Sequence, residues 1–583
     1  MFKSDWLTSD ESAALFGAGR SHAPVALTPL ARPRLLWLNE ACVRDDPCFA
    51  AYGGDLPRYE DHLVMSCAYR VLDDKERLSA PYVTAFADRY GGNGIGLNGG
   101  SGRAVVCGNY HVKGVGRTPL VSSLTPQAHA SGGAYLEESV REAIFSEIVR
   151  HEFPCSAVPV LAIIDTGLVQ VWETERGPKH ERRTLLVRPN VVRPAHFARA
   201  TAFFSGDAKE GSRDVRRVEA FFANMTDAVG NEALAAAFHR FWHQWARQMA
   251  YSFIHRMPHG SNTISNICLN GALLDFGAMS ALPSWASITT MQSPQPFSGQ
   301  FAAIRHAVRN LSYYFGRYAD AAIGSERRIN EQCLSAQRQY RAEVIAQAFR
   351  LCGVDTAVAG LAAAGRDHEL LWRSVSAVIA HFQREAFDLR AALPPLANPW
   401  DVPRVWEGRA PAHLTQWQSI LRDYVGTSEQ SLAEARCRVI ARSRPHLYRE
   451  DAKSAIYDVL ADIQQHDKDD ARDLVSNLIC SQVARGRRDS AHVFEDGIPC
   501  GFAVNAATSF ALYRSRADGK AYAIEEQPAG GQCTLDSRPL PIDQMSTHSV
   551  TFQQECHPAV HGAVALAADD VGEVKWANQR MMS

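Results

Sequence analysis

Residues 259–277, HGSNTISNICLNGALLDFG, place a histidine, an asparagine and an aspartate at defined spacing around two short apolar runs. His259 opens the segment, Asn266 follows, and Asp275 stands directly before a Phe-Gly pair. Amide and carboxylate oxygens at the ends of two short strands can hold Mg²⁺ against nucleotide phosphates, because this ion keeps several waters and needs few protein donors. We therefore predict Asn266 and Asp275 as metal ligands, and His259 as a residue that packs the loop.

A glycine-rich segment upstream could combine a phosphate-binding backbone with a lysine. Residues 90–117 read YGGNGIGLNGGSGRAVVCGNYHVKGVGR, which predicts two short strands, the second ending at Lys113. Because glycine has no Cβ, its backbone N–H groups can approach phosphates closely, and Lys113 could neutralise phosphate oxygens. The alternative is that the glycines only form turns and that Lys113 is a solvated strand end.

A helix is predicted next, over residues 133–149, because apolar side chains recur there at helical spacing. Glu142 lies on its expected inward face, where it could hold the ammonium group of Lys113 in place. Alone, Glu142 would be read as an exposed helix charge. The loop at 259–277 favours the ion pair instead.

Two arginines follow a later apolar strand. Arg188 and Arg193 lie in VRPNVVRPAHF, and their guanidinium groups suit polyphosphate binding. A pair of surface salt bridges explains the same spacing equally well.

These motifs, in this order, resemble those of the SelO-type (selenoprotein O) pseudokinase family of protein adenylyltransferases, over roughly residues 88–320. The loop at 259–277 has the order of a protein-kinase catalytic loop followed by the metal-binding Asp-Phe-Gly. The other matching segments are Gly100-Ser101-Gly102-Arg103, Val112-Lys113-Gly114-Val115-Gly116, Ser139-Val140-Arg141-Glu142, and Arg188-Pro189-Asn190 with Arg193-Pro194-Ala195-His196-Phe197. Beyond about residue 330 no resemblance is recognisable.

The resemblance implies a protein-kinase-like fold that binds ATP in a reversed orientation, with the α-phosphorus presented for attack, so that AMP is transferred. It implies ATP and Mg²⁺ as cofactors, Asn266 and Asp275 as metal ligands, and Glu142 as the residue that positions Lys113. The residues expected to hold the nucleotide are Gly100, Gly102, Arg103, Lys113, Ser131, Gly132, Arg188 and Arg193.

This chain departs from the family pattern at the expected general base. The family has an aspartate directly before the metal-binding asparagine, where this chain has Ser265, and the ordinary kinase base position is Ser261. A positioned base typically contributes about 10²–10⁴-fold to proton transfer, and a serine cannot supply this at neutral pH. A second family Gly-Asp-Gly-Arg is reduced here to Ala130-Ser131-Gly132-Gly133.

Three hypotheses remain open. The acceptor could be a carboxylate, on a protein or a peptide undergoing maturation, which needs no base and would become an acyl-adenylate. The enzyme could instead modify hydroxyl groups, as an adenylyltransferase with another base or as a kinase. It could also be a nucleotide-binding pseudokinase whose C-terminal region docks a partner enzyme. The predicted catalytic residues are Lys113, Glu142 and Ser265.

Composition narrows the class of protein. The net charge of −2 argues against a nucleic-acid binder that works by phosphate neutralisation. No apolar run approaches the roughly 20 residues that span a bilayer, and no secretory signal is visible at the N-terminus. The 13 cysteines lack metal-ligand spacing. We expect a cytoplasmic protein with a protein or peptide substrate.

The predicted fold class is α+β, with the two lobes of a protein kinase and added C-terminal parts. We expect an N-terminal extension over 1–87, including an extended proline-rich arm, PVALTPLARPRLLWL, and a β-rich lobe over 88–200. A helical lobe over 201–390 carries the catalytic and metal loops. A further helical region spans 391–489, and a small strand-rich unit spans 490–583.

Overall fold

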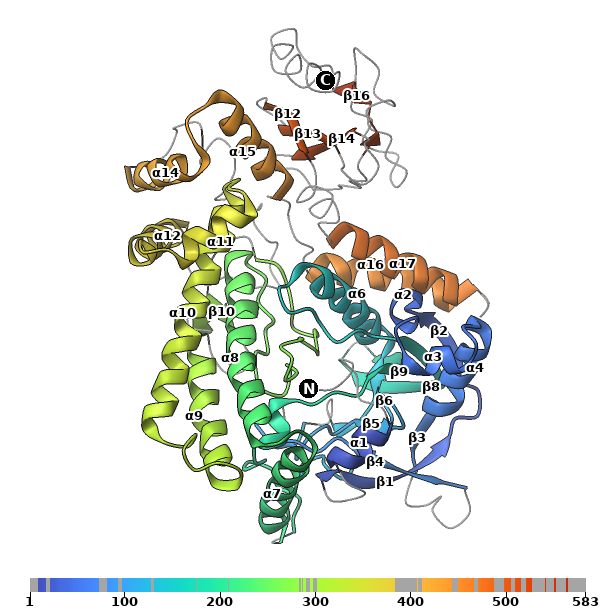
Figure 1. Ribbon diagram of the computed structural model, residues 1–583. Helices are drawn as coiled ribbons and strands as arrows, with labels where there is room; N and C mark the ends of the chain where they lie inside the picture. Colours follow the sequence, from blue (N-terminus) through green and yellow to red (C-terminus); the bar gives the residue numbers. More distant parts are fainter. Residues whose placement is uncertain are drawn as a thin grey trace.

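The computed structural model (Figure 1) describes residues 9–382 apart from 17–20, 73–80, 93–96, 127–129, 176, 208, 283–284, 286, 290–293 and 297–300. Beyond residue 382 it describes Trp406, the segments 412–442, 449–465 and 470–486, and the backbone of short strands between 498 and 564. The fold is a mixture of helices and strands, as the sequence predicted. No helix in these described segments is long and apolar enough to cross a membrane.

A curled antiparallel sheet of nine strands dominates the first 190 residues. The strand order is β2-β8-β9-β6-β5-β4-β1-β3, with β7 paired to β9. The strands are β1 Ala23–Pro29, β2 Arg34–Leu38, β3 Tyr69–Val71, β4 Val83–Ala87, β5 Ala104–Cys107, β6 Tyr110–Lys113, β7 Ala134–Tyr135, β8 Ala162–Thr174 and β9 Gly177–Pro189.

The proline-rich segment near the N-terminus is not an arm, contrary to the prediction. It forms β1 and β2, and β1 pairs with β4 while β2 pairs with β8. The predicted boundary after residue 87 falls between β4 and β5, which are neighbouring strands of the sheet. Residues 23–87 therefore supply strands to the same sheet as the predicted β-rich lobe.

The predicted helix after β7 is present as α6, Leu136–Glu152. Its apolar positions Leu136, Val140, Ile144 and Ile148 are all buried. α6 packs on β8 and β9, so its inward face lies over the face of the sheet that carries Lys113. This packing brings the charges of the helix and the strands together.

The middle of the chain is helical. The predicted long helix is α8, Asn231–Ile254, whose buried Trp242 and Trp245 belong to the largest core cluster. The helices α7 Glu210–Val229, α9 Phe301–Tyr318 and α10 Glu326–Leu351 pack against it, and α11 Thr356–Ala364 and α12 His368–Phe382 pack on α10. Residues 259–277 run from the end of α8 back to the sheet.

The second helical region contains α14 Ala412–Val425, α15 Glu429–Arg442, α16 Arg449–Gln465 and α17 Asp470–Gly486. α16 and α17 return to the sheet and pack on α6, and α17 also contacts β2 (Figure 1). Arg472 of α17 donates to Glu60 of α4 (Leu56–Cys67) at 3.0 Å. These two helices therefore support the outer side of α6.

The remaining described elements are short. They are α1 Ser9–Phe16, α2 Glu40–Val43, α3 Pro47–Ala51, η3 Pro194–Phe197, the hairpin of β10 Ser287–Thr289 and β11 Pro294–Pro296, and the C-terminal strands β12 Ile498–Val504, β13 Ser509–Arg514, β14 Ala521–Glu526, β15 Leu540–Pro541, β16 Val550–Thr551 and β17 Ala563–Val564. The short strands expected after residue 490 are therefore present.

Candidate functional site

Lys113 is the centre of a charged cluster between β6, α6 and the loop at 259–277. Its ammonium nitrogen lies 2.8 Å from Glu142 Oε2, 3.0 Å from Glu138 Oε1 and 3.0 Å from Asp275 Oδ1. The predicted contact between Lys113 and Glu142 is therefore present. The same nitrogen also reaches the aspartate predicted to hold the metal, which connects the two halves of the site.

Glu142 contacts two cations at once. Its Oε1 atom forms an ion pair with Arg188 at 2.9 Å, while Oε2 accepts from Lys113. The sheet explains this arrangement, because β6 and β9 pair with His111 opposite Arg188. Side chains two residues apart on a strand share a face, so Lys113 and Arg188 both point towards α6.

Glu138 is a site residue that the sequence analysis missed. Its carboxylate accepts two hydrogen bonds from the Arg103 guanidinium, at 2.6 and 2.9 Å, in addition to the contact with Lys113. Glu138 and Glu142 are four residues apart on α6 and so lie on one face. The four-residue spacing of the two glutamates in LEESVRE could have indicated Glu138, but the family motif contains only Glu142.

The charges of the cluster hold each other in the ionised form. Burial raises the pKa of Glu138, but the positive charges of Arg103 and Lys113 outweigh this effect and lower it to about 2. Burial opposes ionisation of Asp275 as well, yet Lys113, Arg188 and Arg103 keep its pKa well below the usual range. Burial lowers the pKa of Lys113, whereas Asp275 and the two glutamates raise it above its ordinary value.

Asn266 and Asp275 lie at neighbouring ends of two short paired segments. Ile267 forms an antiparallel bridge with Leu273, and the N–H of Leu274 donates to the carbonyl oxygen of Asn266 at 3.1 Å. Asp275 has a φ of +68°, in the left-handed region that aspartate tolerates better than most residues. This local backbone conformation occurs where the chain turns out of the paired segment beside Lys113.

The side chain of Asn266 is oriented by its own loop. Its Nδ2 atom donates to the carbonyl oxygen and to the hydroxyl of Ser261, both at 3.0 Å. This leaves Oδ1 as the atom able to bind a cation. His259 Nε2 donates to the Leu274 carbonyl at 3.0 Å, and burial lowers the pKa of this imidazole. His259 therefore packs the loop, as predicted.

The oxygen donors of Asn266 and Asp275 suit a hard cation that takes its other ligands from the substrate. Asn266 offers an amide oxygen and Asp275 an ionised carboxylate, and Mg²⁺ bound with nucleotide phosphates needs only one or two such donors. Within the described segments no group of three His, Cys, Asp or Glu side chains is arranged to hold a metal by itself. A site completed by phosphate oxygens and water is compatible with this donor set.

Ser265, a predicted catalytic residue, is hydrogen-bonded at its hydroxyl and at its carbonyl oxygen. Its hydroxyl shares a 2.8 Å hydrogen bond with Thr263, and its carbonyl oxygen accepts from Arg193 at 2.8 Å. Arg193 is in turn paired with buried Asp88 at 3.2 Å and lies over the ring of Tyr90. The structure therefore places Arg193 behind the loop, where it fixes the backbone before Asn266.

The predicted glycines are required by close backbone packing. A Cβ on Gly132, at φ +70°, would lie 2.0 Å from the backbone of Gly116, and one on Gly100 would lie 2.4 Å from the Asp88 carbonyl oxygen. Gly102 is similarly close to the side chains of Val121 and Asn98.

Ser131 shares a 3.0 Å hydrogen bond with the Tyr135 hydroxyl. The segment that contains it reaches the cluster through Gly133, whose carbonyl accepts from Arg103 at 3.0 Å. These contacts explain the loop conformation without a phosphate.

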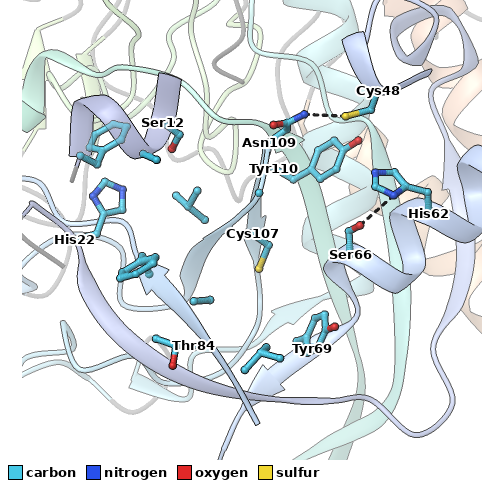
Figure 2. A pocket seen from close by; sticks show the side chains of 17 residues that line it. Ser12, His22, Cys48, His62, Ser66, Tyr69, Thr84, Cys107, Asn109 and Tyr110 are labelled. Atoms are coloured by element: carbon cyan, nitrogen blue, oxygen red, sulfur yellow. Dashed lines mark hydrogen bonds between the residues drawn. The ribbon is translucent and has the colours of Figure 1, made fainter. Parts of the chain in front are cut away.

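A cavity of about 610 Å³ lies elsewhere, against β4, β5 and β6 and between α1 and α4 (Figure 2). His22, His62, Cys107 and Tyr110 are among the side chains that line it, and no lining residue is charged. None of the predicted site residues borders this cavity. A lining without cations does not suit a triphosphate, so the Lys113 cluster remains the candidate site.

No protein-family model matches this chain, and no curated protein matches it significantly. The candidate site is therefore defined by its motifs and by the geometry of the Lys113 cluster.

Proposed function

We propose that this protein is an ATP- and Mg²⁺-dependent nucleotidyltransferase that acts on a protein or peptide acceptor. The observation that carries the proposal is the position of the Lys113 ammonium, within 3.0 Å of both Glu142 and Asp275. A lysine fixed by a helix glutamate beside a metal-binding aspartate is the arrangement that phosphoryl-transfer sites use to hold a nucleotide.

The side chains of the cluster have separable roles in this proposal. Lys113 and Arg103 bind phosphate oxygens, and Glu142 keeps Lys113 and Arg188 in place. Asn266 Oδ1 and the Asp275 carboxylate hold Mg²⁺. When bound, this ion neutralises phosphate charge and fixes the orientation of the triphosphate.

We also propose that the fold is a divergent, SelO-like version of the two-lobed kinase fold. The curled sheet with α6 corresponds to the small lobe, and α8 to α12 correspond to the large lobe. The predicted nucleotide site lies where residues 259–277 return from α8 to the sheet. The packing of α16 and α17 on α6 is a feature that the predicted architecture lacked.

A carboxylate acceptor agrees best with the lack of an available general base among the residues around Lys113. Glu138, Glu142 and Asp275 are all engaged with cations, and Ser265 replaces the expected aspartate. A carboxylate oxygen can attack the α-phosphorus directly, forming the new P–O bond of a mixed anhydride as the bond to pyrophosphate breaks. No proton has to be removed, so no general base is needed.

A regulatory pseudokinase is the second candidate. The same ion pairs favour it, because the Lys113 ammonium already contacts three carboxylates and is not free to bind ATP phosphates. In that case nucleotide binding would control a partner protein, with the C-terminal helices as the docking region.

Labelled ATP distinguishes these functions. The chain is incubated with candidate acceptors and ATP labelled at the α- or the γ-phosphate, and the products are analysed by mass spectrometry. We expect pyrophosphate release and a hydroxylamine-sensitive AMP adduct. A stable AMP adduct on a hydroxyl indicates the parent activity, a phosphate adduct indicates a kinase, and nucleotide binding without turnover indicates a pseudoenzyme.

A further inference from the structure

The Lys113 cluster contains as many acids as bases. Its cations are Lys113, Arg103 and Arg188, and its anions are Glu138, Glu142 and Asp275. The formal charges of these six groups therefore cancel. A triphosphate that enters such a site meets no net positive charge, although binding of a polyanion ordinarily depends on one.

The three acids lie at different depths. The Glu142 side chain is 1% exposed and is enclosed by Lys113 and Arg188, so it belongs to the framework of the site. Glu138 is 16% exposed and Asp275 is 41% exposed, which places both on the solvent side of Lys113. An anion that approaches from solvent therefore meets Asp275, Glu138 and its partner Arg103 before it reaches Lys113.

Glu138 and Asp275 differ in whether a metal ion can replace their protein partners. Asp275 lies beside Asn266 and can exchange its contact with Lys113 for a metal ion. Glu138 forms a two-bond contact with the Arg103 guanidinium and a third contact with Lys113, which is how a phosphate group would bind the same two side chains. Glu138 thus occupies the donors that a phosphate needs.

We propose that Glu138 acts as an internal substitute for phosphate, and that its negative charge makes nucleotide binding depend on a divalent cation. This inference rests on the proposed nucleotide site. Without Mg²⁺, the triphosphate competes with Glu138 for Arg103 and Lys113 and is repelled by it. With Mg²⁺, the added positive charge offsets the carboxylate, and the two cationic side chains turn to the phosphates.

The test compares ATP binding with and without metal. Binding is measured by isothermal titration calorimetry in Mg²⁺ and in EDTA for the unmodified chain and for Glu138→Gln, which removes the charge and keeps the shape. Glu137→Gln is the matched control, because Glu137 is the adjacent helix residue and pairs with Arg141. Thermal unfolding checks each variant, and Glu138→Ala replaces the glutamine variant if that one is unfolded.

Removing the charge should strengthen ATP binding in EDTA by roughly tenfold or more, since a nearby like charge is lost from a partly buried site. Affinity in Mg²⁺ should change less, and Glu137→Gln should match the unmodified chain under both conditions. If the chain binds ATP with Mg²⁺ but Glu138→Gln binds no more tightly in EDTA, Glu138 does not have this role. If neither form binds ATP under either condition, the nucleotide site itself is refuted.

Discussion

The ammonium group of Lys113 lies 3.0 Å from Asp275 Oδ1, although 162 positions separate the two residues in the chain. One comes from the end of β6 and the other from the loop that follows α8. Their contact is long-range and joins the sheet to the helical part of the chain.

Loss of the lysine should destabilise the fold as well as the site. Lys113→Met leaves three carboxylates close together without their shared cation, and breaking such a buried pair typically costs about 3 kcal/mol of unfolding free energy. Lys179→Met is the control, because Lys179 forms an exposed pair with Glu181 that should contribute less than about 1 kcal/mol. Urea denaturation measures both; equal effects would show that the Lys113 cluster does not stabilise the protein.

Loss of the predicted metal ligand should remove turnover. Asp275→Asn keeps the shape of the side chain and removes the charge that would hold Mg²⁺, so we expect metal-dependent product formation to fall by about 10² or more. Asp207→Asn, in an exposed ion pair with Arg213, should behave as the unmodified chain. Retention of most activity in Asp275→Asn would rule out this aspartate as the metal ligand.

Ser265 tests the nature of the acceptor. Its hydroxyl bonds to Thr263 and carries no acidic group, so Ser265→Ala should change the rate by less than about threefold if a carboxylate is the acceptor, because no proton transfer is lost. Rates of pyrophosphate release report the outcome. A fall of a hundredfold would indicate that the serine takes part in the reaction and would contradict the carboxylate hypothesis.

Stability should depend on pH through Glu138. Its folded-state pKa of about 2 is below the ordinary value of 4.5. The stabilisation is therefore fully present above about pH 4.5 and is lost as the pH falls towards 2. The difference in unfolding free energy between the unmodified chain and Glu138→Gln should shrink over that window. A difference that stays constant down to pH 2 would show that the ion pairs do not depress the pKa of this carboxylate.

The local features of the site could be predicted from the sequence. Apolar residues at helical spacing predicted α6 and α8, and two short strand-like runs around the turn at 108–109 predicted β5 and β6. The order of His259, Asn266 and Asp275 was enough to predict that Asn266 and Asp275 belong to one site.

Long-range packing could not be predicted in the same way. The proline-rich segment carries no sign of its partner strands, which are β3, β4 and β8, so the sequence predicted an extended arm. Nothing local indicates that α16 and α17 return to α6. Glu138 was missed because its contacts with Arg103 and Lys113 depend on how α6 packs on the sheet, which no local pattern shows.

A crystal structure with Mg²⁺ and a non-hydrolysable ATP analogue tests the central claim most directly. The account predicts one cation within about 2.1 Å of Asn266 Oδ1 and an Asp275 oxygen, phosphate oxygens on Lys113 and Arg103, and the α-phosphorus facing solvent. Nucleotide bound away from Lys113, for example in the cavity beside α1, or a γ-phosphate turned outward, would contradict it.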